Sequence, residues 1–278
     1  MRKILIHNNQ LSDFPKMDED YLEISVFNNK IETLPNELWN QNKLEILNIS
    51  ANKIKSISDK LGSLQKLKMI DFGHNQISEI PKSIGKLTNL NSFVYIHNNC
   101  IENLPNEITL LENVQYLNIS ENLIGKLPEN IGNLKNLIEF KAEINQLGEL
   151  PSSFCNLKKL TELNLSNNKI KSLPIEFGNL KKLRVLNLDN NSIKQLPINN
   201  SELREIYLRN NLITEIPITI SKLKNLRKID LRGNQITELP EELLKLKSIE
   251  RIDLRWNSNI KIPEWVVELE KRNCIIYY

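Results

Sequence analysis

Cysteine is scarce in this chain of 278 residues, which contains Cys100, Cys155 and Cys274. The three are odd in number, far apart in sequence, and not clustered at either end, where disulfide-bonded caps would stand. We therefore expect a reducing compartment.

Long apolar runs are also missing near the start of the chain. The first residues, MRKILIHNNQLSDFPK, hold two basic residues and an apolar run of only three before His7 and Asn8. Such a run is too short for a signal peptide or a membrane span. We expect a cytoplasmic protein without a membrane partner, with secretion that needs no classical signal left open.

Glycine is limited to eight residues, and the sequence contains neither a G-x-x-x-x-G-K-[ST] nor a G-x-G-x-x-G motif. Asp71-Phe72-Gly73 spells a kinase motif, but no glycine-rich loop or HRD segment accompanies it. His74 and His97 lie on neighbouring repeats near Asp71, and two histidines with one carboxylate would make only a weak metal site. We expect no enzyme activity, no catalytic residue, no cofactor and no metal.

A repeat dominates what is present. The segments LEILNISANKI (44–54), VQYLNISENLI (114–124), LTELNLSNNKI (160–170), LRVLNLDNNSI (183–193) and LRKIDLRGNQI (226–236) share the pattern L-x-x-L-x-L-x-x-N-x-I/L. The repeated asparagine, here called the motif asparagine, occurs twelve times: Asn9, Asn29, Asn52, Asn75, Asn99, Asn122, Asn145, Asn168, Asn191, Asn211, Asn234 and Asn257. Most repeats continue I-x-x-L-P-x-x-I-x-x-L, as in ITELPEELLKL.

This pattern resembles the 23-residue, LPxxIxxL-type leucine-rich repeats of many bacterial proteins and of the Ras-group-related and Shoc2-like proteins, over the whole chain. Alternating apolar positions such as Leu163 and Leu165, with Leu160 ahead of them, direct one side of a short strand into the core. Strands stack about 4.8 Å apart and helices about 10 Å apart, which bends the stack into a horseshoe. We expect an α/β leucine-rich-repeat solenoid, with a parallel concave β-sheet and short helical or irregular convex segments. One domain should cover residues 1–278.

Irregular repeats predict local departures from this pattern. Residues 15–22 and 197–203 are too short to supply a full convex segment. Residues 90–101 carry one extra residue, which we expect a bulge in or just after the strand to absorb, re-aiming Phe93, Tyr95 and His97.

The last residues predict a helix and a thirteenth strand. Residues 263–272 read as an amphipathic helix, and in 274–278 we place Ile275 and Tyr277 at core positions. Ile276 and Tyr278 would then face the concave side, as a cap or as a site for strand pairing with a second chain. We expect a monomer, with an edge-strand dimer as the alternative.

The exposed strand positions of the final repeats are rich in arginine. Arg209, Arg232 and Arg255 share one column on successive repeats, and Asp230 and Asp253 share another with Tyr207. An arginine–aspartate ladder that neutralises itself is one interpretation, since exposed pairs contribute only ~0–1 kcal/mol each. The other is a recognition patch, because arginine and large aromatic residues dominate binding hot spots.

The candidate partner-binding residues combine this arginine-rich region with aromatic residues of the earlier repeats. They are Tyr207, Arg209, Arg227, Arg232, Arg251, Arg255, Trp256, Phe93, Tyr95 and Tyr116.

The charge pattern favours a protein partner. The formal net charge is only +3, and nearby acidic residues would repel phosphates, so we expect no nucleic-acid partner. Those acidic residues are Asp189, Glu205, Asp230, Glu250 and Asp253.

The sequence thus predicts a protein–protein recognition module that uses its concave face. Two alternatives remain open: a host-directed bacterial effector or delivered surface protein, and the targeting arm of an enzyme whose catalytic domain lies outside this chain. For the first prediction, we expect reversal of Arg232 and Arg255 to glutamate to abolish partner capture while thermal stability stays nearly unchanged.

Overall fold

The computed structural model describes residues 2–196 and 200–278. It divides into two compact units, residues 1–145 and 146–278. In both units each repeat contributes a three-residue parallel strand, and most repeats add a short helix, as the repeat pattern predicts. The single domain predicted over residues 1–278 stays a prediction.

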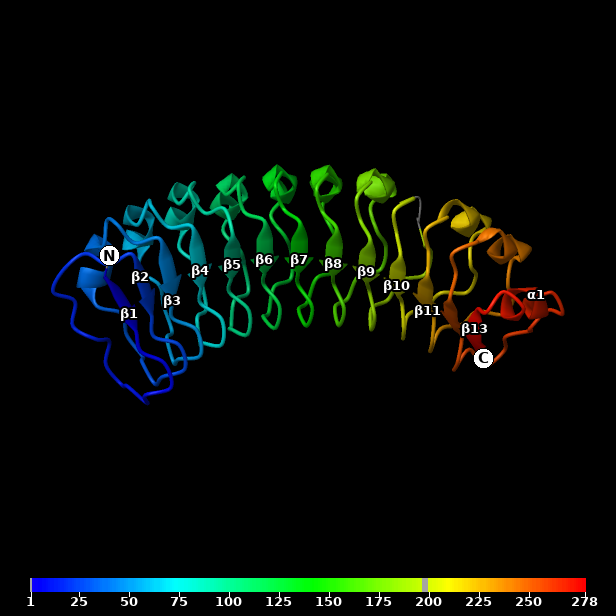
Figure 1. Ribbon diagram of the computed structural model, residues 1–278, viewed down its shortest axis with the longest axis horizontal. Helices are drawn as coiled ribbons and strands as arrows, with labels where there is room; N and C mark the ends of the chain where they lie inside the picture. Colours follow the sequence, from blue (N-terminus) through cyan, green and yellow to red (C-terminus); the bar gives the residue numbers. More distant parts are fainter. Residues whose placement is uncertain (1, 197–199) are drawn as a thin grey trace. The chain divides into compact units, whose positions relative to one another are not determined.

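The strands of each unit pair in sequence order, as Figure 1 shows. In the first unit they are β1 (Lys3–Leu5), β2 (Glu23–Ser25), β3 (Ile46–Asn48), β4 (Met69–Asp71), β5 (Phe93–Tyr95), β6 (Tyr116–Asn118) and β7 (Glu139–Lys141). In the second they are β8 (Glu162–Asn164), β9 (Val185–Asn187), β10 (Glu205–Tyr207), β11 (Lys228–Asp230), β12 (Arg251–Asp253) and β13 (Ile275–Tyr277).

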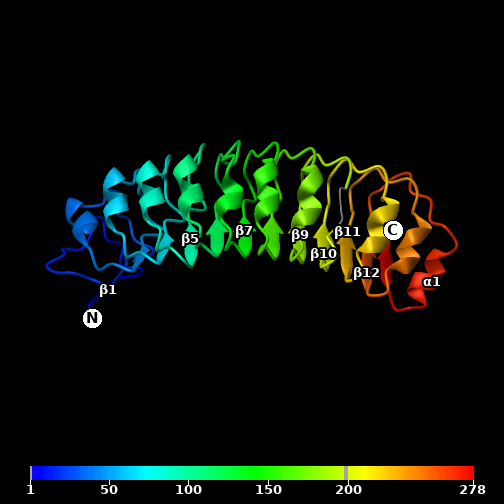
Figure 2. The ribbon, with the colours of Figure 1, turned by 90° about the horizontal axis from the view of Figure 1, so that it is seen from above.

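The helices are mostly 3₁₀ and form a second row beside the strands of each unit (Figure 2). The first unit contains η1 (Asn36–Asn40), η2 (Asp59–Ser63), η3 (Lys82–Lys86), η4 (Asn106–Leu110) and η5 (Ile131–Asn133). The second contains η6 (Ser152–Asn156), η7 (Ile175–Asn179), η8 (Ile218–Lys222), η9 (Glu241–Lys245) and α1 (Val266–Glu270). A proline directly precedes most 3₁₀ helices, for example Pro81 at φ −66°, because its ring fixes the backbone angle and the first turn needs no amide donor there.

The core lies between the strands and the helices. Leu160, Leu163 and Leu165 are fully buried or nearly so, which confirms the predicted alternation. The motif asparagines satisfy the buried turns. Asn52 shows the pattern: its Nδ2 donates to the carbonyls of Val26 (2.9 Å) and Ile49 (3.0 Å), and its Oδ1 accepts from the Ile31 amide (3.0 Å).

The extra residue of the 90–101 segment lies before the strand and not in or after it. Leu90 is buried in its usual place, and a bend at Ser92 precedes β5. Because Lys68 O accepts from the amides of both Asn91 and Ser92, the insertion is absorbed there. Phe93 then pairs with Tyr116 in normal register, so the predicted bulge and its re-aiming of side chains are wrong.

The first shortened repeat agrees with its prediction, since residues 15–22 contain no helix. Of the second, 197–203, residues 197–199 lie outside the described part of the chain.

The C-terminal helix and strand are confirmed as α1 and β13, but the predicted strand orientation is wrong by one residue. Ile276 pairs with the core residue Ile252, while Ile275 and Tyr277 pair with Arg251 and Asp253 on the other side. Ile275 and Tyr277 are therefore exposed. The spacing from β12 to β13 is 24 residues, and no motif asparagine follows β13 to reveal the shift.

Candidate functional site

An exposed tryptophan surrounded by arginines stands out in the second unit. We use "sheet face" for the side of the strands and of the turns directly after them that points away from the core. There Trp256 is 61% exposed. The guanidinium carbons of Arg209, Arg232 and Arg255 lie 5.5, 5.8 and 5.9 Å from its ring centroid, within cation–π range.

Two buried aspartates hold two of these arginines. Arg255 donates from Nε to Asp253 Oδ1 (2.9 Å) and from Nη2 to Oδ2 (2.7 Å), a bidentate pair. Arg232 pairs in the same way with Asp230, and its Nε also lies 3.6 Å from Asp253 Oδ2. The Asp253 side chain is only 3% exposed and that of Arg232 24%.

The pKa of Asp253 reflects this arrangement. Burial alone would raise it, but hydrogen bonds from Arg255 and the charges of Arg255 and Arg232 outweigh burial, so the pKa lies below its usual value. The carboxylate therefore stays ionised at neutral pH. The solvated, self-neutralising ladder considered from the sequence is replaced by a network whose acidic half is buried beneath its arginines.

This network corrects the expectation for reversing Arg232 and Arg255 to glutamate. Both changes would leave Asp253 buried without a cation, and breaking a buried pair typically costs about 3–5 kcal/mol. A loss of binding in that double variant would thus be accompanied by a loss of stability.

Arg209 differs from its two neighbours because it forms no ion pair within residues 2–196 and 200–278. Its amide donates to Asp189 Oδ1 (2.7 Å), but its Nε is buried without a hydrogen-bond acceptor. Burial raises the pKa of Asp189, although the hydrogen bond from the Arg209 amide opposes this. Arg209 is the guanidinium beside Trp256 with donors left for a partner.

Tyr207 is held at the edge of this group. Its hydroxyl donates to Glu205 and accepts from Lys228 Nζ (3.0 Å), and the same ammonium lies 4.6 Å from the Tyr207 ring centroid. A hollow of about 360 Å³ opens between Tyr207, Asp189 and Arg251.

Tyr277 belongs to the same surface and was missed from the sequence. The guanidinium carbons of Arg251 and Arg255 each lie 4.9 Å from its ring centroid. The one-residue error in the orientation of β13 had assigned Tyr277 to the core. A register measured from β12, where Tyr277 follows Tyr207, Asp230 and Asp253 in one column, is the signal that identifies it.

Arg227 is the one predicted residue of the second unit outside the Trp256 group. It precedes β11, and its Nε and Nη2 lie 2.8 and 2.7 Å from Glu250 Oε1. The structure therefore brings together six of the seven predicted residues of this unit, which we call the Trp256 cluster: Tyr207, Arg209, Arg232, Arg251, Arg255 and Trp256.

The three predicted aromatic residues of the first unit form a separate cluster on its sheet face. The ring centroids of Phe93 and Tyr116 are 4.8 Å apart, and those of Phe93 and Tyr95 are 5.2 Å apart. His97 continues the cluster 6.0 Å from Tyr95, and His74 packs on His97 at 4.6 Å. All three aromatic residues are half-buried, and burial raises the pKa of Tyr95.

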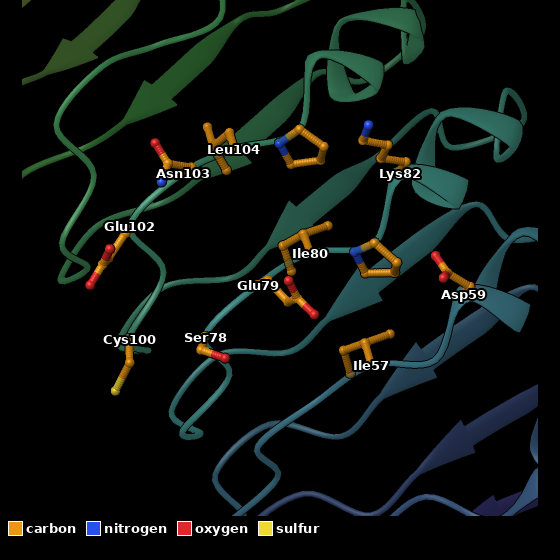
Figure 3. A pocket seen from close by; sticks show the side chains of 12 residues that line it. Ile57, Asp59, Ser78, Glu79, Ile80, Lys82, Cys100, Glu102, Asn103 and Leu104 are labelled. Carbon is orange, nitrogen blue, oxygen red and sulfur yellow. The ribbon is translucent and has the colours of Figure 1, made fainter.

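A hollow of about 700 Å³ opens elsewhere in the first unit. Figure 3 shows its lining, in which Ile57, Ile80 and Leu104 come from equivalent positions of three successive repeats, with Glu79 and Glu102 beside them. Because these positions recur along the chain, the hollow follows from the repeat itself.

Ligand and membrane features were also examined in the part of the chain that the structure describes. There, no group of three or more His, Cys, Asp or Glu side chains is placed to hold a metal ion. Likewise, none of its helices is long and apolar enough to cross a membrane. The three cysteines are free thiols, and burial raises the pKa of Cys155 and of Cys274 to about 11.

Solved structures similar to this chain include a plant peptide hormone receptor, RGFR1, in complex with RGF2: 28% identity, TM-score 0.76, 84% of this chain and 40% of the receptor chain covered. This chain thus spans well under half of that receptor chain. A leucine-rich-repeat protein of Leptospira interrogans is 25% identical over 92% of this chain and 83% of its own, with a TM-score of 0.54. An internalin of Listeria monocytogenes is 22% identical over 89% and 85%, with a TM-score of 0.58, and shows the fold alone.

No curated protein matches the chain. A family model described as "Leucine rich repeat" matches residues 42–94, 143–193 and 201–258, more than half of the chain. A second model of the same description matches residues 113–134. The chain therefore belongs to the leucine-rich repeat family.

Proposed function

We propose that this chain is a recognition module that binds a polypeptide partner on the sheet face of its second unit, at the Trp256 cluster. The observation that carries the proposal is the exposed Trp256 ring among three guanidinium groups, two of them fixed by buried aspartates. Tryptophan, tyrosine and arginine are the residues that most often dominate binding energy at protein interfaces. Fixed side chains lose little conformational entropy on binding, which favours affinity.

The chemistry of the cluster suggests what the partner segment presents. Trp256 offers a large apolar surface, and Arg209 offers guanidinium donors that no carboxylate occupies in the described residues. An apolar side chain next to an acidic one would meet both. The similarity to a plant receptor solved in complex with RGF2 supports a polypeptide as the ligand class.

We also propose that the repeats are of the 23-residue LPxxIxxL type, because most strand pairs are 23 residues apart and a proline precedes most 3₁₀ helices. Cytoplasmic location, a monomeric state and the two alternative functions stay predictions.

The test compares partner capture by three forms of the full chain. Wild type should retain a partner that the Trp256→Ala variant loses, with Kd raised at least about tenfold once the partner is purified. The matched control is Ile175→Ala, which removes an apolar side chain 87% exposed on η7 of the same unit. Ile175→Ala should bind as wild type does.

Thermal melting of each variant checks that the fold is retained. Equal affinity of wild type and Trp256→Ala for the captured partner would refute the Trp256 cluster as its binding site. Arg209→Gln provides a second readout, since it removes an unpaired charge and leaves both aspartate pairs in place.

A further inference from the structure

A second feature of the second unit lies where its strands begin, outside the Trp256 cluster. A hollow of about 500 Å³ opens there beside the residues that precede β10, β11 and β12, which are Arg204, Arg227 and Glu250. Lys247 comes from the turn before β12, and Arg272 follows α1. Three successive repeats and the C-terminal helix thus contribute to one opening, here called the basic hollow.

The basic hollow concentrates positive charge. The whole chain has a formal net charge of only +3, yet here four cationic side chains surround the single carboxylate of Glu250. Glu250 is already paired with Arg227. Arg204, Lys247 and Arg272 have no carboxylate partner among residues 2–196 and 200–278, and all three side chains are exposed. Like charges held this close repel one another, and a multivalent anion would remove that cost.

We propose that the basic hollow binds a phosphoryl group carried by a polypeptide segment. A phosphoryl group has about two negative charges and three acceptor oxygens, which match several cations better than a single carboxylate does. Arginine guanidinium groups bind phosphate oxygens in a bidentate manner, and arginine clusters are a recurrent way of reading phosphorylated segments. The inference rests on the proposed function only in taking a polypeptide as the carrier.

The surroundings favour one phosphoryl group over a nucleic-acid backbone. Glu250 interrupts the positive surface inside the hollow, and Glu202 lies at its rim, with Oε1 3.5 Å from Asn225 Nδ2. A phosphodiester backbone needs an uninterrupted series of cations and would meet both carboxylates.

The experiment measures binding of a dye-labelled glycine–serine peptide with two adjacent phosphoserines by fluorescence anisotropy. We expect the unphosphorylated peptide to bind at least tenfold more weakly. Arg204→Gln/Lys247→Gln should raise Kd for the phosphopeptide at least tenfold. The matched control, Lys181→Gln/Lys182→Gln, removes the same charge from an exposed turn of the same unit and should change Kd less than twofold.

Glu250→Gln gives a test in the opposite direction. It removes the only carboxylate of the basic hollow and frees Arg227, so we expect Kd for the phosphopeptide to fall severalfold. Trp256→Ala should leave phosphopeptide binding unchanged, and this separates failure of the basic hollow from failure of the proposed function.

Four results would overturn the proposal. Equal losses in the two double variants would reduce the effect to net charge. Unchanged or weaker binding by Glu250→Gln would contradict the charge argument. Tighter binding of an oligodeoxythymidine than of the phosphopeptide would assign the hollow to nucleic acid, and inorganic phosphate binding as tightly as the phosphopeptide would remove the polypeptide carrier.

Discussion

At the scale of single residues, one backbone position in every repeat adopts a positive φ, directly before the motif asparagine. Asparagine is frequent there because its short polar side chain tolerates the left-handed region. Along this column Asn190 Nδ2 donates to Asn167 Oδ1 (3.0 Å), and Asn210 Nδ2 donates to Asn190 Oδ1 (2.7 Å). Trp256 occupies the same position at φ 65°. A bulky residue is disfavoured there, so its exposed ring is retained at a cost in stability, as is common at functional sites.

Gly233 occupies this position in the preceding repeat, at φ +65°, and a Cβ there would lie 2.3 Å from Asn210 Oδ1. We predict that Gly233→Ala lowers the free energy of unfolding by about 1–2 kcal/mol, measured by chemical denaturation. In the double variant with Asn210→Ala the loss should be less than additive, because the clash is gone. Gly148→Ala is the control, since no atom lies within 4 Å of its added Cβ. Strict additivity would show that Asn210 does not confine the glycine.

His97 provides a prediction about pH. Burial lowers its pKa below 6.5, despite the opposing charges of Asp71, Glu121 and Glu143 and with a contribution from His74. The unfolded chain therefore binds the proton more readily, so the free energy of unfolding should fall as the pH drops below about 6.5.

The measurement is denaturation at pH 7.5 and at pH 5.5. His97→Gln should reduce the difference in stability between the two pH values, and His7→Gln, at an exposed position, should keep it. The same difference in both variants would show that other groups set the pH dependence.

At the scale of elements, the sequence predicts a strand wherever the motif asparagine marks the register. It fails where the marker is absent or the spacing changes. The extra residue before β5 could occupy several places of similar sequence, and only the amide contacts to Lys68 O select one. Because side chains alternate along a strand, a one-residue error at β13 reversed which of Ile275 and Ile276 faces the core.

The candidate site follows the same rule. The column of Arg209, Arg232 and Arg255 could be read from the repeat, because strand spacing fixes it. The burial of Asp230 and Asp253 could not, since it depends on how arginine side chains from neighbouring repeats fold over them. Arg227 was grouped with the cluster because it shares the face in sequence, although it pairs with Glu250 at the start of the strands.

The register of β13 can be tested directly. Ile276→Asp should lower the free energy of unfolding by about 1–3 kcal/mol, because it places a carboxylate in the core column next to Ile252. Ile275→Asp, at a position 54% exposed, should change it by less than about 0.5 kcal/mol. Denaturation monitored by circular dichroism measures both, and the reverse order of damage would restore the orientation first inferred from the sequence.

At the scale of the whole molecule, the question is whether the two compact units unfold together. In repeat proteins stability is roughly a sum over repeats and their nearest neighbours, and cooperativity can fail in long arrays. The sequence keeps the 23-residue spacing from Asn145 to Asn168 with no inserted linker. We therefore predict one transition.

Tryptophan fluorescence can report on each unit separately. Trp39 is buried in the first unit, and Trp256 and Trp265 lie in the second. A chain with Trp256→Phe/Trp265→Phe reports on the first unit, and Trp39→Phe reports on the second. Their urea midpoints should coincide. Adding Gly233→Ala to both chains should shift both midpoints together, because a cooperative chain transmits a loss of stability in one unit to the other. If the Trp39 reporter does not shift, the units unfold independently and the chain is two domains.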